Sequence, residues 1–154
     1  MTDRGAEPAV LRAGMRMMTG ARAGVTATTA MTAVLLSARV LGAARRTPPR
    51  AVTEGVVPSV ARAPEPVARA ATTATHYAFG IVSGATFALV APHLPGPRVV
   101  KGVGFAMVVM VLSYEGWVPA AGLLPPQHRL DRPRAAALVA SHLVFGAVLG
   151  RLAA

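Results

Sequence analysis

The chain has 154 residues, of which 53% are hydrophobic and only 14% are charged, and its mean hydropathy is +0.50. Soluble domains carry about 25% charged residues, so this composition argues against a water-soluble fold. The sequence contains no cysteine, which excludes disulfide bonds and thiolate metal sites. The length predicts one compact unit.

The net charge of +10 comes from 16 basic residues against six acidic ones. A nucleic-acid-binding protein would gather such residues on one face or stripe. Here they fall between apolar runs, where anionic lipid headgroups would meet them. We therefore predict the lipid bilayer and its anionic headgroups as partners, and no nucleic acid. The basic clusters occupy residues 4–22, 45–69, 98–101 and 129–134.

Four stretches are long and apolar enough to cross a bilayer, which takes about 20 residues. After a basic N-terminal tail (1–18), they predict a four-helix transmembrane domain over residues 19–154. The fold class is therefore all-α, an integral membrane bundle of four transmembrane helices. The expected spans are residues 19–41, 70–91, 99–118 and 134–153.

The first span is the least apolar, because several threonines dilute it. An alternative is a secretory signal peptide cleaved at the small residues 42–44, which would leave three spans. Basic residues divide almost evenly between the two sides of the membrane. The arginines that precede or open the first span favour a cytoplasmic N-terminus.

The connection at residues 43–69 is rich in arginine and proline and cannot form one continuous helix. Within it, Val52, Val56 and Val60 recur every four residues. This spacing suits a short segment in the headgroup plane, kinked at Pro58. An irregular loop is the alternative.

A motif of the second span recurs in the fourth. Residues 75–84 read THYAFGIVSG and residues 141–150 read SHLVFGAVLG, so both contain His-x-x-x-Gly-x-x-x-Gly. Residues four apart share one face of a helix. Glycines on that face let a partner backbone approach closely. The predicted helix-packing residues are Gly20, Gly24, Gly80, Gly84, Gly146 and Gly150.

The repeat predicts two helical hairpins related by an axis along the membrane normal. The second and fourth spans would then run parallel, with His76 beside His142 at one depth. We expect the motif to form a packing seam once in each half and to bring these two spans together. Because such stripes also join separate chains, a homo-oligomer is a further predicted partner.

Four ionisable residues reach one level of the predicted bundle: Arg39, His76, Glu115 and His142. Ionisable groups inside a membrane are costly and point to function, so this polar intramembrane cluster is the candidate site. We expect Glu115 to pair with Arg39, and the histidines suit a proton relay. The alternative is interfacial anchoring, with charged side chains extending into headgroups beside an aromatic belt. That belt would contain Tyr77, Tyr114 and Trp117.

No cofactor is predicted. Haem ligation by His76 and His142 would hold two helices apart, whereas glycines on the same face bring them together. Two histidines and Glu115 are suitable metal ligands by type, but no local ligand spacing supports a metal site. The sequence also contains no phosphate loop, nucleophile elbow or Ser/His/Asp arrangement in a credible context. We therefore predict that the protein is not an enzyme.

The segment from His76 to Gly150 resembles the YagU-like group of small bacterial inner-membrane proteins of unknown function. The resemblance rests on HYAFG, the proline-bearing turn APHLPGPR, the exit GLLPP and the final SHLVFG. It covers about half of the chain. It implies a multi-pass membrane protein and no catalytic residue.

These observations predict a multi-pass protein of the bacterial plasma membrane with a non-enzymatic structural or accessory role. The alternative is a small oligomeric transporter or channel that uses the Arg39, His76, Glu115 and His142 cluster to move protons or ions.

Overall fold

The computed structural model describes residues 6–42 and 48–153, and this part of the chain is helical without a strand. Four helices, with their short extensions, are long and apolar enough to cross a membrane: Ala9–Val40, Glu65–His93, Arg98–Ala120 and Arg132–Ala153. The expected all-α bundle is confirmed. Arg4, Arg45, Arg46 and the last two residues of the predicted cleavage site (43 and 44) lie outside the described residues.

The four long helices are α1 (Ala6–Val40), α4 (Glu65–Val90), α5 (Arg98–Val111) and α7 (Arg132–Ala153). A short 3-10 turn, η1 (Ala91–His93), extends α4. Beyond α5 the chain continues through a π-helical turn, η2 (Leu112–Trp117), into α6 (Val118–Ala120). A second 3-10 turn, η3 (Gln127–Arg129), precedes α7.

The arginine- and proline-rich connection forms two short helices, α2 (Pro48–Val56) and α3 (Pro58–Ala61). A proline opens each of them, a position where the missing N–H costs no hydrogen bond. The break between them falls at Val57, directly before Pro58, the residue at which the sequence predicts a kink. The described part of this connection is thus helical rather than an irregular loop, and α2 packs against α4.

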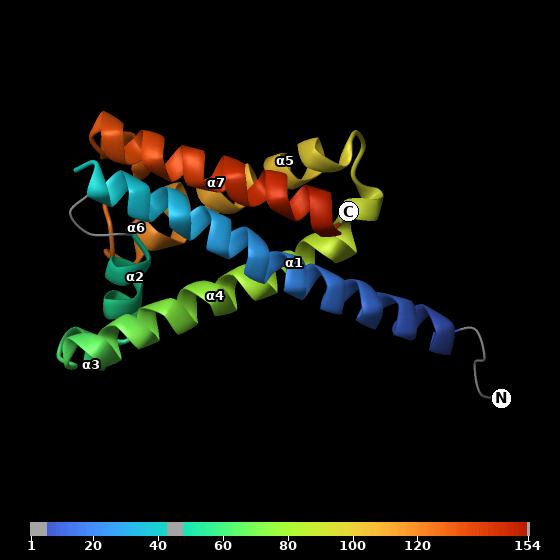
Figure 1. Ribbon diagram of the computed structural model, residues 1–154, viewed down its shortest axis with the longest axis horizontal. Coiled ribbons are helices and arrows are strands. Elements are labelled where there is room, and N and C mark those ends of the chain that lie inside the picture. The colour runs from blue at the N-terminus through green and yellow to red at the C-terminus, as the bar shows by residue number, and fades with distance from the viewer. Residues whose placement is uncertain (1–5, 43–47, 154) are drawn as a thin grey trace.

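Helix α1 begins at Ala6, so residues 6–18, expected as a tail, continue the first span as helix. Its 35 residues extend about 52 Å, against a hydrocarbon core of about 30 Å. Figure 1 shows the N-terminal part of α1 projecting beyond the other helices. Large apolar side chains on this part, among them Val10, Leu11 and Met15, are exposed.

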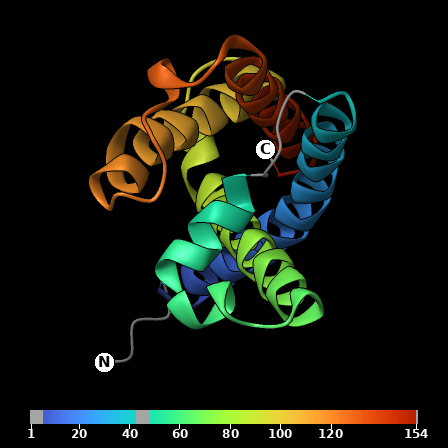
Figure 2. The ribbon, with the colours of Figure 1, turned by 90° about the vertical axis from the view of Figure 1, so that its left-hand side faces the viewer.

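Helix α1 lies between α4 and α7, and α5 packs against α7. Helices α1 and α5 run in one direction and α4 and α7 in the other (Figure 1). The molecule is therefore two antiparallel hairpins, α1–α4 and α5–α7, joined where α1 meets α7. In an end-on view, α5 and α7 lie across the top, α1 lies on the right and α4 lies below (Figure 2).

Glycines form the contact within the first hairpin. A Cβ atom added to Gly20 would overlap the Gly84 carbonyl, and one added to Gly24 would overlap the Gly80 carbonyl. In the opposite direction, a Cβ on Gly80 would overlap the hydroxyl of Thr28. Because only glycine leaves room here, the backbones of α1 and α4 approach each other closely.

The second hairpin is built in the same way. A Cβ on Gly146 would lie 2.6 Å from the carbonyl oxygen of Gly102, and one on Gly150 would overlap the carbonyl of Arg98. Each copy of the motif thus packs against the membrane-spanning helix that precedes it in the chain. The expectation that the second and fourth spans pack along their glycines is therefore corrected: Gly80 faces α1 and Gly146 faces α5.

Candidate functional site

The candidate site lies at the end of the bundle where α1 and α4 diverge from their crossing (Figure 1). The glycine contacts hold the two helices together around Gly24 and Gly80, and beyond that point the helices separate. Helix α2 covers part of the space between them. This arrangement creates a chamber between α2, α4, η2 and α7, and a groove between α1, α2 and α4.

Helix α2 is attached to α4 by polar contacts. The hydroxyls of Thr53 and Thr75 share a hydrogen bond of 2.7 Å. Arg50 pairs with Glu54 on its own helix and donates through Nη2 to Glu65 Oε2 over 3.1 Å. The hydrogen bond to Glu54, followed by the bond and charge of Glu65, raises the pKa of Arg50 above its usual value. These contacts fix α2 above the chamber.

The opposite wall of the chamber is the π-helical turn η2. Gly116 leaves helical geometry there, with φ −105° and ψ −110°. Ser113, Tyr114 and Trp117 of this turn line the chamber. Sequence reasoning placed these residues on a regular span and missed the turn. The available signal was Gly116 three residues before Pro119, since glycine and proline together interrupt helices.

The chamber has a volume of about 240 Å³. Half-exposed Phe79 and Trp117 line it, so it opens to the outside of the bundle. Its volume lies below the range of about 300–1,000 Å³ for whole ligands, and suits the head of a longer molecule. Its walls are formed by Pro49, Val52, Thr53, Val56, Val57, Thr75, His76, Phe79, Ser113, Tyr114, Trp117, Val118 and His142.

His142 is buried on α7 in a defined tautomer. Its Nδ1 lies 2.8 Å from the carbonyl oxygen of Leu138, and a carbonyl accepts hydrogen bonds only. Nδ1 therefore carries the proton, and Nε2 of the neutral ring is an acceptor. The ring of Tyr114 meets the His142 ring edge-on, with centroids 5.9 Å apart.

His76 on α4 lines both the chamber and the groove. Its Nε2 is buried without a hydrogen-bond partner among the described residues. His76 lies eleven residues after the start of α4 and His142 ten after the start of α7, about 15–17 Å along each helix. The two histidines therefore lie at one depth beside one chamber.

The groove, of about 680 Å³, lies next to the chamber. Arg39 comes from the last turn of α1, Arg50 from α2, and Glu65 and Arg69 from the first turns of α4. Arg69 Nη2 lies 3.2 Å from Glu65 Oε1. Deeper in the groove the walls are Thr32, Leu35, Leu36, Pro49, Thr72, Thr73, His76 and Tyr77.

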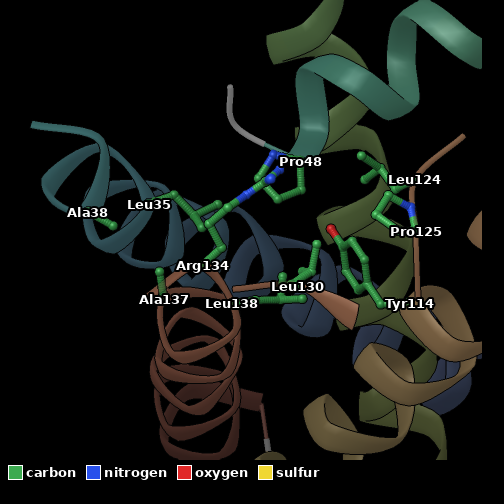
Figure 3. Close-up of a pocket in the computed structure, with 10 residues that line it drawn as sticks. All are labelled: Leu35, Ala38, Pro48, Tyr114, Leu124, Pro125, Leu130, Arg134, Ala137 and Leu138. Carbon is green, nitrogen blue, oxygen red and sulfur yellow. The ribbon is translucent and has the colours of Figure 1, made fainter. Parts of the chain in front are cut away.

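A third cavity, of about 20 Å³, lies between the end of α1 and the start of α7 (Figure 3). Arg134 extends across it towards Pro48, and the Tyr114 hydroxyl points into it. Tyr114 lines both this cavity and the chamber. The space is large enough for about one water molecule, which suits the polar groups around it.

The expected pairing of Glu115 with Arg39 is corrected. Both Glu115 carboxylate oxygens accept hydrogen bonds from His128, from the backbone N over 2.9 Å and from Nδ1 over 2.8 Å. Glu115 lies in the π-helical turn, and its partner His128 lies in η3, in the connection between α6 and α7. The predicted cluster therefore divides into three places: Arg39 in the groove, Glu115 beside His128, and the two histidines at the chamber.

Within residues 6–42 and 48–153, no three histidine, aspartate or glutamate side chains lie close enough to share a metal ion. The donors at the chamber are two imidazoles with hydroxyl and aromatic neighbours. Such groups bind through hydrogen bonds and apolar contact.

No significant match was found among curated proteins or among solved structures. Residues 15–154 match a family of unknown function, DUF6789. This match covers both hairpins and every residue of the chamber and groove. It gives no link to the YagU-like group, so that resemblance stays a prediction. The chain therefore belongs to the family of unknown function DUF6789.

Proposed function

We propose that the protein is a non-enzymatic accessory component of the bacterial plasma membrane that holds a lipid-soluble molecule by its polar head. The observation that supports this is the chamber, which combines apolar walls with an unsatisfied histidine nitrogen and a second histidine in a defined tautomer. His76 Nε2 is buried without a described partner, and the hydrogen bond from His142 Nδ1 leaves Nε2 of that ring as an acceptor. Buried polar groups are normally satisfied, so a ligand group that completes these bonds is favoured.

The tautomer of His142 determines which kind of polar group the ligand must carry at its head. Because Nε2 accepts, the complementary ligand group is a donor, and a hydroxyl is the smallest donor that an apolar chain carries. A long-chain alcohol, an isoprenoid alcohol or a quinol has this form. Its head would lie between His76 and His142, and its chain would leave past Phe79 and Trp117 into lipid.

Trp117 provides a direct test, because it is the only tryptophan in the chain and lines the chamber. Purified protein in detergent micelles is titrated with 11-bromo-1-undecanol, whose bromine quenches tryptophan fluorescence. We expect saturable quenching. His142→Phe should weaken the apparent affinity about two- to tenfold, the effect of one lost hydrogen bond.

Two controls complete this experiment. His93→Phe makes the same replacement in the turn after α4, at the other end of the bundle, and should quench as the parent protein does. 1-Bromoundecane lacks the hydroxyl and should quench only in proportion to its concentration. Equal, non-saturable quenching by the two compounds would show that the chamber does not bind the hydroxyl group specifically.

A second candidate is a small oligomeric transporter that moves protons, and the position of His76 favours it. His76 lines both the groove and the chamber, and His142 lies across the chamber at the same depth. Histidine titrates near neutral pH and can pass a proton between two spaces. Four helices enclose little volume, so we propose conduction only for an oligomer.

Liposomes that contain the protein and the trapped pH dye pyranine test this candidate. After an external pH step, a relay predicts faster internal acidification than in protein-free liposomes. His76→Gln should remove the difference, whereas Arg62→Gln, outside both cavities, should preserve it. Equal rates with and without protein would reject proton movement and leave the binding role unaffected.

A further inference from the structure

We propose that the groove between α1, α2 and α4 is a binding site for the headgroup phosphate of an anionic phospholipid, with Arg39 as its principal ligand. This site lies next to the chamber and shares Pro49 and His76 with it, but its arginines do not line the chamber. It rests on the charges in the groove, on the position of the groove along the helices, and on the apolar surface beside it.

One cationic side chain of the groove has no acidic partner. Glu65 pairs with both Arg50 and Arg69, and Arg50 pairs in addition with Glu54. Arg39 makes no ion pair with any carboxylate of the described residues. The groove therefore has an excess of positive charge centred on Arg39. Arginine binds phosphate oxygens through two parallel hydrogen bonds, which makes phosphate the complementary group.

The position matches the headgroup layer. Arg39 is the penultimate residue of the first membrane-spanning segment, and Glu65 is the first residue of the second. The open end of the groove therefore lies where the hydrocarbon ends and phosphates begin. Helix α2, which carries Arg50, lies at the same level.

The apolar surface suits a lipid rather than a free ion. Leu35 and Leu36 line the groove one turn below Arg39, and Leu36 is half exposed. Acyl chains attached to a phosphate at Arg39 would run along this part of α1. A soluble phosphate has no apolar part that would contact these side chains.

Native mass spectrometry of the full-length protein in detergent tests the proposal. The probes are palmitoyl-oleoyl phosphatidylglycerol and, as its neutral counterpart, palmitoyl-oleoyl phosphatidylcholine. We expect phosphatidylglycerol to bind more tightly. Arg39→Gln should weaken its first binding event about tenfold, as loss of a charge-assisted contact predicts. Arg62→Gln removes the same charge near the start of α4, outside the groove, and should change binding less than about twofold.

A second variant covers the case in which Arg39→Gln does not fold. Arg69→Gln keeps Arg39 but removes a groove cation whose side chain is 74% exposed, and it should also weaken phosphatidylglycerol binding. Inorganic phosphate distinguishes the two sources of the anion. If it binds at millimolar concentration while the two lipids bind equally, the site takes a soluble anion and the lipid proposal is overturned. If Arg39→Gln and Arg62→Gln weaken phosphatidylglycerol binding equally, binding depends on the net charge of the protein, and a specific site at Arg39 is overturned.

Discussion

At the scale of single residues, Gly24 and Gly104 make opposite predictions for one substitution. Both are helical glycines in membrane-spanning segments. An added Cβ on Gly24 would overlap the backbone of α4, whereas Gly104 has nothing within 4 Å. Gly24→Ala should therefore destabilise the fold by about 1–3 kcal/mol, the usual cost of overpacking. Gly104→Ala should be neutral or stabilising, because alanine favours helix.

Unfolding of the two variants by sodium dodecyl sulfate in mixed micelles, followed by circular dichroism, measures this difference. Both variants replace glycine by alanine in a membrane-spanning helix, so helix propensity cannot explain a difference in stability between them. If Gly24→Ala and Gly104→Ala unfold together with the parent protein, the close approach of α1 and α4 is wrong.

Residue types and spacing predicted part of the site. The repeated motif and the parallel direction of the second and fourth spans predicted one depth for His76 and His142, and the structure places both beside one chamber. The partner of Glu115 was not predictable in the same way. That pairing depends on the π-helical turn, and one unusual turn rotates every later side chain away from the expected face. His128, its partner, lies in a connection that carries no periodic pattern.

At the scale of helices, the contacts of the two hairpins predict which cysteine pairs form disulfides in this Cys-free chain. A Cβ on Gly20 would lie 2.6 Å from that of Ala88, and one on Gly146 would lie 2.8 Å from that of Ala106. A cysteine at either glycine also overlaps the backbone of the neighbouring helix, so the two helices must move apart, at the cost of overpacking. The same movement brings both pairs towards the usual disulfide separation of about 3.8 Å. Cysteines at either pair should cross-link within one chain on oxidation in native membranes.

Cysteines at Gly80 and Gly146 are the matched contrast, because these residues face α1 and α5 respectively. We expect no cross-link between them, as read from peptides linked after proteolysis. A strong Gly80–Gly146 cross-link within one chain would restore the seam between the parallel helices and contradict the packing order α4–α1–α7–α5.

The helices themselves were predictable, but their partners were not. The length of the apolar stretches predicts four spans, whatever their arrangement. A stripe of small residues four apart predicts a helix contact but does not identify the partner helix. Both copies of the motif carry the same stripe, so the sequence alone allows them to meet each other or their preceding helices. The choice depends on connection geometry, such as the tight turn closed by Lys101 Nζ donating to the Ala91 carbonyl over 3.0 Å.

At the scale of the whole molecule, α1 is the shared element of both halves. Its small and apolar residues form one core with α7, and its glycines contact α4. The groove and the chamber occupy the end where these contacts no longer hold the helices together. Tight packing through the glycines and open space around α2 are thus two consequences of the same crossing.

The central position of α1 also sets an order of events during synthesis. The first hairpin is complete once His93 has been made, but the α7 side of α1 stays uncovered until Ala153, sixty residues later. At about 5–20 residues per second, that interval is about 3–12 seconds. Throughout this interval, the membrane-insertion machinery or lipid must shelter Ala27, Met31 and Leu35 of the nascent chain, until α7 packs against α1.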